Sequence, residues 1–242
     1  MSIAKRLLVA SLFVLISASL LMGQSASSGR SSGSELSVEE SYLQDAVERM
    51  IIQEQIRADS RDMKLVALRY IEDAISRGNT GPEIHSALEY LALEGVLNKT
   101  RENGRLTNNY PDVRTRAAAY LGDLGTREAK NTLIKIVMAD PEPMVLTEAI
   151  KSLARIGINE NGETEMAISW IVTRFDVLNP DNLLALSALE AFETLSQNGG
   201  LSDPNAIRTI IRIAEGPYIR PVQDKAKALL AQMREQGASN SR

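Results

Sequence analysis

Few side chains in this sequence have the type and spacing that catalysis or metal binding requires. His85 is the only histidine and there is no cysteine, which excludes two-histidine metal motifs, thiol chemistry and most histidine-based triads. The acidic pairs Glu39-Glu40 and Glu72-Asp73 are adjacent, so on a helix the two carboxylates of each pair project about 100° apart and do not converge for acid–base work. No phosphate-binding loop, nucleophile elbow or calcium loop occurs. We therefore predict no catalytic residue, no cofactor and no metal.

The composition favours an all-α protein. Of the 242 residues, 44% are apolar but only 4% are aromatic, which favours helices packed through small and aliphatic side chains. The formal net charge is −4, and loss of Lys5 and Arg6 with a leader peptide would change it to −6. Such a chain lacks the basic excess of a nucleic-acid-binding protein. We therefore expect no nucleic-acid partner.

Residues 1–26 have the features of a secretory signal peptide. Lys5 and Arg6 precede an uncharged run at 7–22, and small and polar residues follow it at 23–26. The run is a little short for a membrane-spanning helix, which needs roughly 20 apolar residues. We predict cleavage and export to the periplasm or the medium, with no stable membrane insertion afterwards. The alternative is an uncleaved N-terminal anchor.

A helical repeat occupies the region between a flexible Ser/Gly linker at 27–37 and a disordered tail at 237–242. One face of a predicted helix carries Val113, Ala117, Leu121 and Leu124. The same template recurs after shifts of 32, 39 and 38 residues, at Val145/Ala149/Leu153/Ile156, Leu184/Ala188/Phe192/Leu195 and Val222/Ala226/Leu230/Met233. A fainter copy begins at Met63. Such a period predicts a repeat array over 38–236, because each unit buries its apolar face only against its neighbours.

Prolines and glycines indicate where these helices begin and end. Gly125, Gly157 and Gly199-Gly200 follow apolar faces as C-caps, and prolines precede the next helices. Each template helix is expected to be followed by a second helix, at 84–97, 129–138, 166–175 and 206–214. A helix at 38–58 is expected to cap the first repeat. The Ala of the template is expected where neighbouring helices approach closely.

The segment from 111 to 125 resembles the signature of HEAT repeats, particularly the short bacterial kind called PBS-lyase-like repeats. The residues that carry the resemblance are Pro111-Asp112-Val113-Arg114, Ala117-Ala118, Leu121-Gly122 and Leu124-Gly125. The unit at 143–157 lacks the Arg, and the last two units lack the Leu-Gly step. Over about 60–235, the resemblance implies an all-α solenoid of four to five HEAT-like helix pairs with an N-terminal capping helix. It also implies that the second helices line the concave side of a protein-interaction scaffold.

Applied to this sequence, the resemblance places five cations on second helices. We call them the cationic strip: Lys130, Lys135, Arg174, Arg208 and Arg212. They could bind an acidic partner. The alternative is ordinary solvated helix charge, because Glu83, Glu89, Glu128 and Glu165 on equivalent helices can interrupt the strip.

Two further features are candidates for partner binding. The polar segment 98–110 interrupts the repeat spacing, and long loops in compact domains are often functional. We rank it above the strip, with contacts through Lys99, Arg101, Arg105 and Tyr110; the alternative is a tolerated insertion. Trp170, the only tryptophan, lies among apolar residues, and we interpret it as a core residue, with an exposed partner anchor as the alternative.

The sequence thus predicts an exported, non-enzymatic scaffold or adaptor that binds a protein through the concave face or the 98–110 loop. A second class of function, an enzymatic one, follows from the resemblance, since some proteins with these repeats are lyases or isomerases that attach bilin chromophores. The export signal argues against this function, because that chemistry is intracellular. A third is an envelope protein that self-associates through Leu43, Val47 and Met50. The sequence does not fix the oligomeric state.

Overall fold

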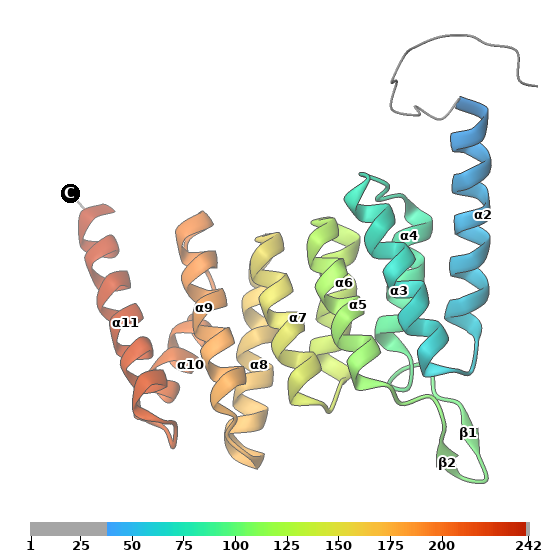
Figure 1. Ribbon diagram of the computed structural model, residues 1–242. Coiled ribbons are helices and arrows are strands. Elements are labelled where there is room, and N and C mark those ends of the chain that lie inside the picture. The colour runs from blue at the N-terminus through green and yellow to red at the C-terminus, as the bar shows by residue number, and fades with distance from the viewer. Residues whose placement is uncertain (1–37, 241–242) are drawn as a thin grey trace, which may run out of the picture. The chain divides into compact units, whose positions relative to one another are not determined.

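The chain folds into successive helices that form two layers (Figure 1). The structure, a computed structural model, describes residues 38–240, without the side chains of 38–42, 178 and 236–240. The chain divides after Tyr42 into two units, and the helical repeats belong to the second, which begins at Leu43. The predicted signal peptide at 1–26, the linker at 27–37 and residues 241–242 of the predicted tail lie outside the described residues.

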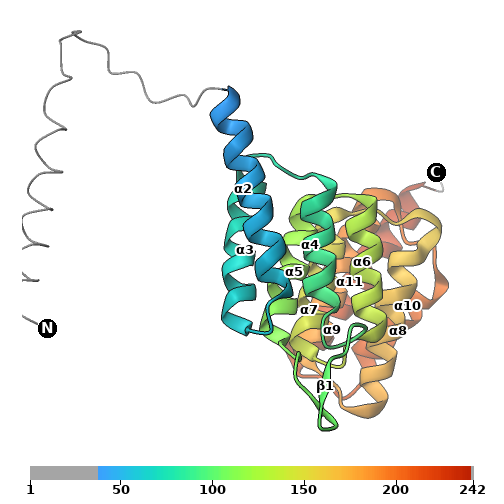
Figure 2. The ribbon, with the colours of Figure 1, turned by 90° about the vertical axis from the view of Figure 1, so that its right-hand side faces the viewer.

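The two layers alternate along the chain. The first-helix layer contains α3 (Arg61–Ser76), α5 (Pro111–Leu124), α7 (Pro143–Ile156), α9 (Asn182–Gly199) and α11 (Arg220–Asn240). The second-helix layer contains α4 (Pro82–Leu93), α6 (Arg127–Ala139), α8 (Glu163–Leu178) and α10 (Pro204–Glu215). Each helix packs against its neighbours within its layer, α5 on α7 and α8 on α10 for example (Figures 1 and 2). This arrangement confirms the all-α solenoid of HEAT-like repeats.

Single helices stand at the two ends of the array. Helix α2 (Val38–Arg57) comes before the four pairs, and Ile52 and Ile56 attach it to the core. At the other end, α11 continues past residue 236, where the sequence predicted the solenoid to end. A short 3-10 helix (Glu160–Gly162) and a two-stranded antiparallel hairpin, β1 (Arg101–Glu102) with β2 (Arg105–Leu106), complete the described elements.

Local sequence signals account for most helix boundaries. Proline occupies the first turn of α4, α5, α7 and α10, where its missing N–H costs nothing. Gly125 and Gly157 end α5 and α7 in the left-handed conformation, with φ of 65° and 69°. One expected boundary is wrong: α4 ends at Leu93 and not at 97, because Glu94 turns to an extended conformation and begins the approach to the hairpin.

Small residues allow successive first helices to pack closely. The alanines of the four clear templates, Ala117, Ala149, Ala188 and Ala226, are completely buried. Gly122 shows how little room is left between α5 and α7: a Cβ added there would lie 2.7 Å from both Cβ and Oγ of Ser152. The position therefore requires a residue without a side chain.

Two cations at equivalent places in the repeat are buried with carboxylates. Lys64 and Arg114 each follow the first residue of a template, and each is 1% exposed. Lys64 Nζ lies 2.9 Å from Glu94 Oε1, and Arg114 Nε lies 2.6 Å from Asp140 Oδ2. Both carboxylates directly follow the end of a second helix, so each pair ties a first helix to the end of a second one. In the next repeat the equivalent residue is Leu146, which carries no charge.

The close contact at Gly122 generates a stability prediction. We expect Gly122→Ala to lower the free energy of unfolding by about 1–3 kcal/mol, because the new methyl group overpacks the α5–α7 contact. Gly199→Ala is the matched control, since a Cβ there meets nothing within 4 Å; it should be neutral or slightly stabilising. Urea denaturation followed by circular dichroism measures both variants. Equal stability of the two would contradict the close packing of α5 on α7.

Candidate functional site

A groove of about 1040 Å³ crosses the second-helix layer between α6, α8 and α10. We call it the second-helix groove. Four large apolar side chains that line it are exposed, Met138 on α6 and Met166, Trp170 and Val177 on α8. Clustered exposed apolar side chains of this size mark interaction sites. The groove lies in the layer that the HEAT resemblance places on the concave side.

The periodicity of α8 explains why Trp170 faces the groove. Ile168, Ile171 and Val172 are buried on the core side of the helix. Trp170 belongs to the opposite face, one turn after Met166 and one turn before Arg174. Its exposed fraction is 39%, so its interpretation as a core residue is wrong, and its position is the exposed one that the alternative requires. The guanidinium carbon of Arg174 lies 5.4 Å from the centroid of the indole ring.

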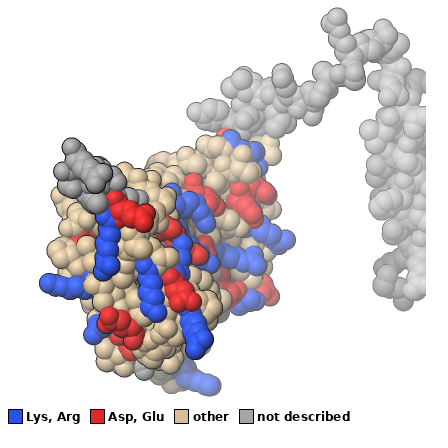
Figure 3. Space-filling view, turned by 90° about the vertical axis from the view of Figure 1, so that its left-hand side faces the viewer, with Lys and Arg blue, Asp and Glu red and all other residues tan. Residues whose placement is uncertain are grey.

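The structure separates the members of the cationic strip. Lys130 is 2% exposed and forms an ion pair with Glu163 of α8, so it is not a surface cation, which corrects its predicted place. Lys135 Nζ lies 2.6 Å from Glu89 Oε1 of α4. Arg174, Arg208 and Arg212 do line the groove together. The end of the array formed by α11 shows no continuous cationic surface, because cations and carboxylates are interspersed there (Figure 3).

Asp203 in the groove and Asp176 behind it each use one carboxylate oxygen in a contact within the chain. Arg212 Nε lies 3.1 Å from Asp176 Oδ2. Asp203 caps α10 by accepting a hydrogen bond from the backbone N–H of Asn205 at 3.0 Å. Burial, and then the charge of Asp176, raises the pKa of Tyr218 above its ordinary value, so this phenol is neutral at physiological pH.

Glu165 has a structural role that sequence reasoning missed. It was expected on a helix surface, but it is completely buried, which corrects that expectation. Its carboxylate accepts hydrogen bonds from the backbone N–H groups of Ser202, at 3.1 Å, and Asp203, at 2.8 Å. Glu165 thereby fixes the start of α10 against α8, which positions one wall of the groove on the other. No local sequence signal marks the contact with α10, because Ser202 and Asp203 lie more than 30 residues away from Glu165.

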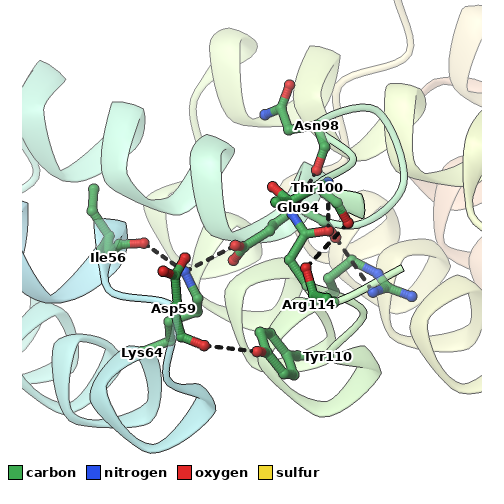
Figure 4. Close-up of polar contacts among 10 residues, drawn as sticks. Ile56, Asp59, Lys64, Glu94, Asn98, Thr100, Tyr110 and Arg114 are labelled. Carbon is green, nitrogen blue, oxygen red and sulfur yellow. Dashed lines mark hydrogen bonds and ion pairs between the residues drawn. The ribbon is translucent and has the colours of Figure 1, made fainter. Parts of the chain in front are cut away.

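The 98–110 loop is a hairpin with a fixed base. Lys99, Arg101 and Arg105 are exposed on it. The buried Asn108 closes the base: its side-chain amide donates to the carbonyl of Asn98 at 2.8 Å, and its Oδ1 accepts from the N–H of Thr100 at 2.9 Å (Figure 4). The loop therefore presents its three cations on a fixed base.

Tyr110 at the end of the loop joins this fixed base to the core. It is half-buried, and its hydroxyl donates to the carbonyl of Asp59 at 2.9 Å (Figure 4). Burial first, and then the carboxylates of Glu94 and Asp59, raises the pKa of this hydroxyl, so it remains a donor at physiological pH. Its hydroxyl is thus already used in a hydrogen bond within the chain, so it does not donate to a partner.

A buried polar network lies beneath the hairpin. Besides pairing with Asp140, the guanidinium of Arg114 donates to Asn109 Oδ1 at 2.8 Å. The ammonium of Lys64 donates to the carbonyl of Ile56 at 2.8 Å (Figure 4). The network connects the ends of α2, α4 and the hairpin to the beginnings of α3 and α5. It explains how an insertion can interrupt the repeat spacing without separating the repeats.

The described part of the chain offers neither a metal cluster nor a membrane span. Within residues 38–240, no group of three or more His, Asp or Glu side chains is placed to hold a metal ion. No helix in the same range combines the length and the apolar character that crossing a bilayer requires.

Comparison with known proteins agrees with this architecture. A family model described as HEAT repeats matches residues 103–193, from the hairpin to α9. The match covers α6 and α8 but ends before α10, and it spans less than half of the chain. HEAT repeats commonly serve as protein-interaction scaffolds and are generally a non-catalytic fold. No curated protein matches the chain.

The network under the hairpin generates a second prediction. We expect Asp140→Ala to lower the free energy of unfolding by about 3–5 kcal/mol, because it leaves the buried guanidinium of Arg114 without its carboxylate. Asp123→Ala is the control: its pair with Arg155 has side chains 44% and 46% exposed, and removing an exposed pair costs about 0–1 kcal/mol. Chemical denaturation compares them. Equal losses would show that the Arg114 pair does not stabilise the array.

Proposed function

We propose that this chain is a non-enzymatic scaffold that binds a protein partner in the second-helix groove. The observation that carries the proposal is the exposed position of Trp170 in a groove that the exposed Met138 and Met166 also line. Aromatic residues are effective anchors in a concave surface, because they bury much apolar area with few rotatable bonds. Methionines beside them adapt their flexible, polarizable side chains to the partner. Exposing them to water in a free protein is costly, and a partner that covers them recovers that free energy.

The groove suits a partner better than the hairpin does. Protein interfaces combine an apolar centre with a polar rim, and the groove has apolar side chains on α6 and α8 beside arginines on α8 and α10. The hairpin presents mainly charged side chains, and Tyr110 is already engaged with Asp59. Exposed lysines and arginines on a loop contribute little binding free energy on their own.

Export is the second part of the proposal. It is supported by the cations at Lys5 and Arg6, the uncharged run at 7–22 and the small residues that follow. We place the scaffold in the periplasm or the medium and assign its repeats to the short PBS-lyase-like kind, on the signature at 111–125. The exposed stripe of Leu43, Val47 and Met50 on α2 is the surface that the self-association alternative would use.

Site-specific photocrosslinking tests the partner-binding face. A photoreactive phenylalanine replaces Met166 in the groove or, as the control, the exposed Lys151 on α7. In an extract of the native source, we expect one protein to crosslink at 166 and not at 151, and Trp170→Ala to reduce its yield at least about tenfold, as for the loss of an interface anchor. Equal crosslinking at both positions, or crosslinking that is insensitive to Trp170→Ala, would overturn the proposal.

A further inference from the structure

Two arginines in the second-helix groove have no carboxylate partner among residues 43–235. Arg208 donates only to the neutral Asn205, with Nη1 3.3 Å from Oδ1. Arg174 lies over the ring of Trp170. Of the other three charged residues that line the groove, Glu163 pairs with Lys130 and Arg212 pairs with Asp176, while Asp203 accepts a hydrogen bond from the backbone of α10. The groove therefore offers two guanidinium groups that no carboxylate of the described chain pairs with, although the protein as a whole has a formal charge of −4.

The positions of these arginines restrict what can bind. The cation–π contact holds the Arg174 guanidinium beside Trp170, where part of its hydration is already removed. Arg208 extends from α10, on the other wall of the groove, and Met166 lies one helical turn from Trp170 on α8. A ligand that covers the indole with an apolar group must bring acceptors for both guanidinium groups, because a desolvated cation without a partner is costly. Carboxylates are the acceptors that fit a guanidinium best.

The shape of the groove favours a peptide over a small molecule. It is open to solvent and extends over three helices, whereas pockets for small ligands enclose most of the ligand. Grooves between helices commonly receive an amphipathic segment of another protein, whose apolar side chains recur at helical spacing.

We propose that the second-helix groove binds an acidic amphipathic peptide segment of a partner protein, with apolar side chains on Trp170 and Met166 and carboxylates on Arg174 and Arg208. This inference rests on the proposed function and adds the chemistry of the partner. It explains why an acidic protein keeps these two arginines without carboxylate partners in the groove that its only tryptophan lines.

Trp170 is itself the reporter for the test. Because the chain has a single tryptophan, its emission changes only when the groove changes, provided that the added peptide contains none. The probe is a synthetic helical peptide with Leu along one face and Glu on its flanks, and the matched control peptide has every Glu replaced by Gln. We expect the acidic peptide to shift the emission to the blue saturably and the control to bind at least about tenfold more weakly.

Variants of the protein locate the charge effect. Arg174→Gln with Arg208→Gln should weaken binding of the acidic peptide at least about tenfold, and added salt should weaken binding to the native protein. Arg69→Gln with Lys151→Gln removes two exposed cations from the first-helix layer and should leave the Kd unchanged. The Kd of each variant is measured from the anisotropy of a labelled peptide. Tryptophan emission is not used for the variants, because loss of Arg174 alters that emission directly. Circular dichroism confirms that each variant is folded.

Three results would overturn the inference. If the Gln peptide binds as tightly as the Glu peptide, the groove is a peptide site without acidic preference, and the proposed function stands. If neither peptide binds at about 1 mM, the chemistry assigned to the partner is wrong, while the crosslinking experiment still decides the function. If dodecanoate shifts the emission with the same dependence on the two arginines and displaces the peptide, the ligand is an amphiphilic carboxylate and not a protein segment.

Discussion

Close packing of neighbouring first helices through alanine and glycine is the constraint on which the rest of the structure depends. Ala117 and Ala149 are completely buried, and Gly122 leaves no room for a methyl group against α7. A single helix pair cannot bury its apolar face alone, so contact between successive units supplies the core. Because the first layer and the interior between the layers use the large aliphatic residues, the outer faces of the second helices do not have to contribute to folding. Helix α8 can therefore expose Trp170 while Ile168, Ile171 and Val172 on its opposite face remain in the core.

Polar contacts between repeats determine the shape of the groove. Glu165 holds the start of α10, and the pair of Lys130 with Glu163 connects α6 to α8. These contacts fix all three helices that line the groove before any partner arrives. A preorganised surface loses less conformational entropy on binding, so the same apolar contacts yield higher affinity. In this way the buried charges of Lys130 and Glu165 help to determine the binding site.

The repeat architecture could be predicted from the sequence because its signals are local. Apolar spacing fixes the core face of each helix, and residues such as Pro111 and Gly125 fix the ends. The site could be predicted only in part. Whether a helical residue is buried depends on which segment packs against the face of the helix that carries it. For Trp170, Lys130 and Glu165, that segment belongs to a neighbouring repeat, and the local sequence does not identify it. The hairpin at 101–106 was missed because its strands are too short and polar to show alternation.

Hydrogen exchange read out by mass spectrometry tests most directly whether the second-helix groove is the binding face of a fixed scaffold. The chain is compared alone and saturated with the acidic peptide. We expect slower exchange in α8 and α10 and along the groove side of α6, with no change in α5 and α7, whose amides are already protected by packing within the first-helix layer. Slowing confined to the hairpin at 101–106 or to α2, with α8 and α10 unaffected, would contradict it.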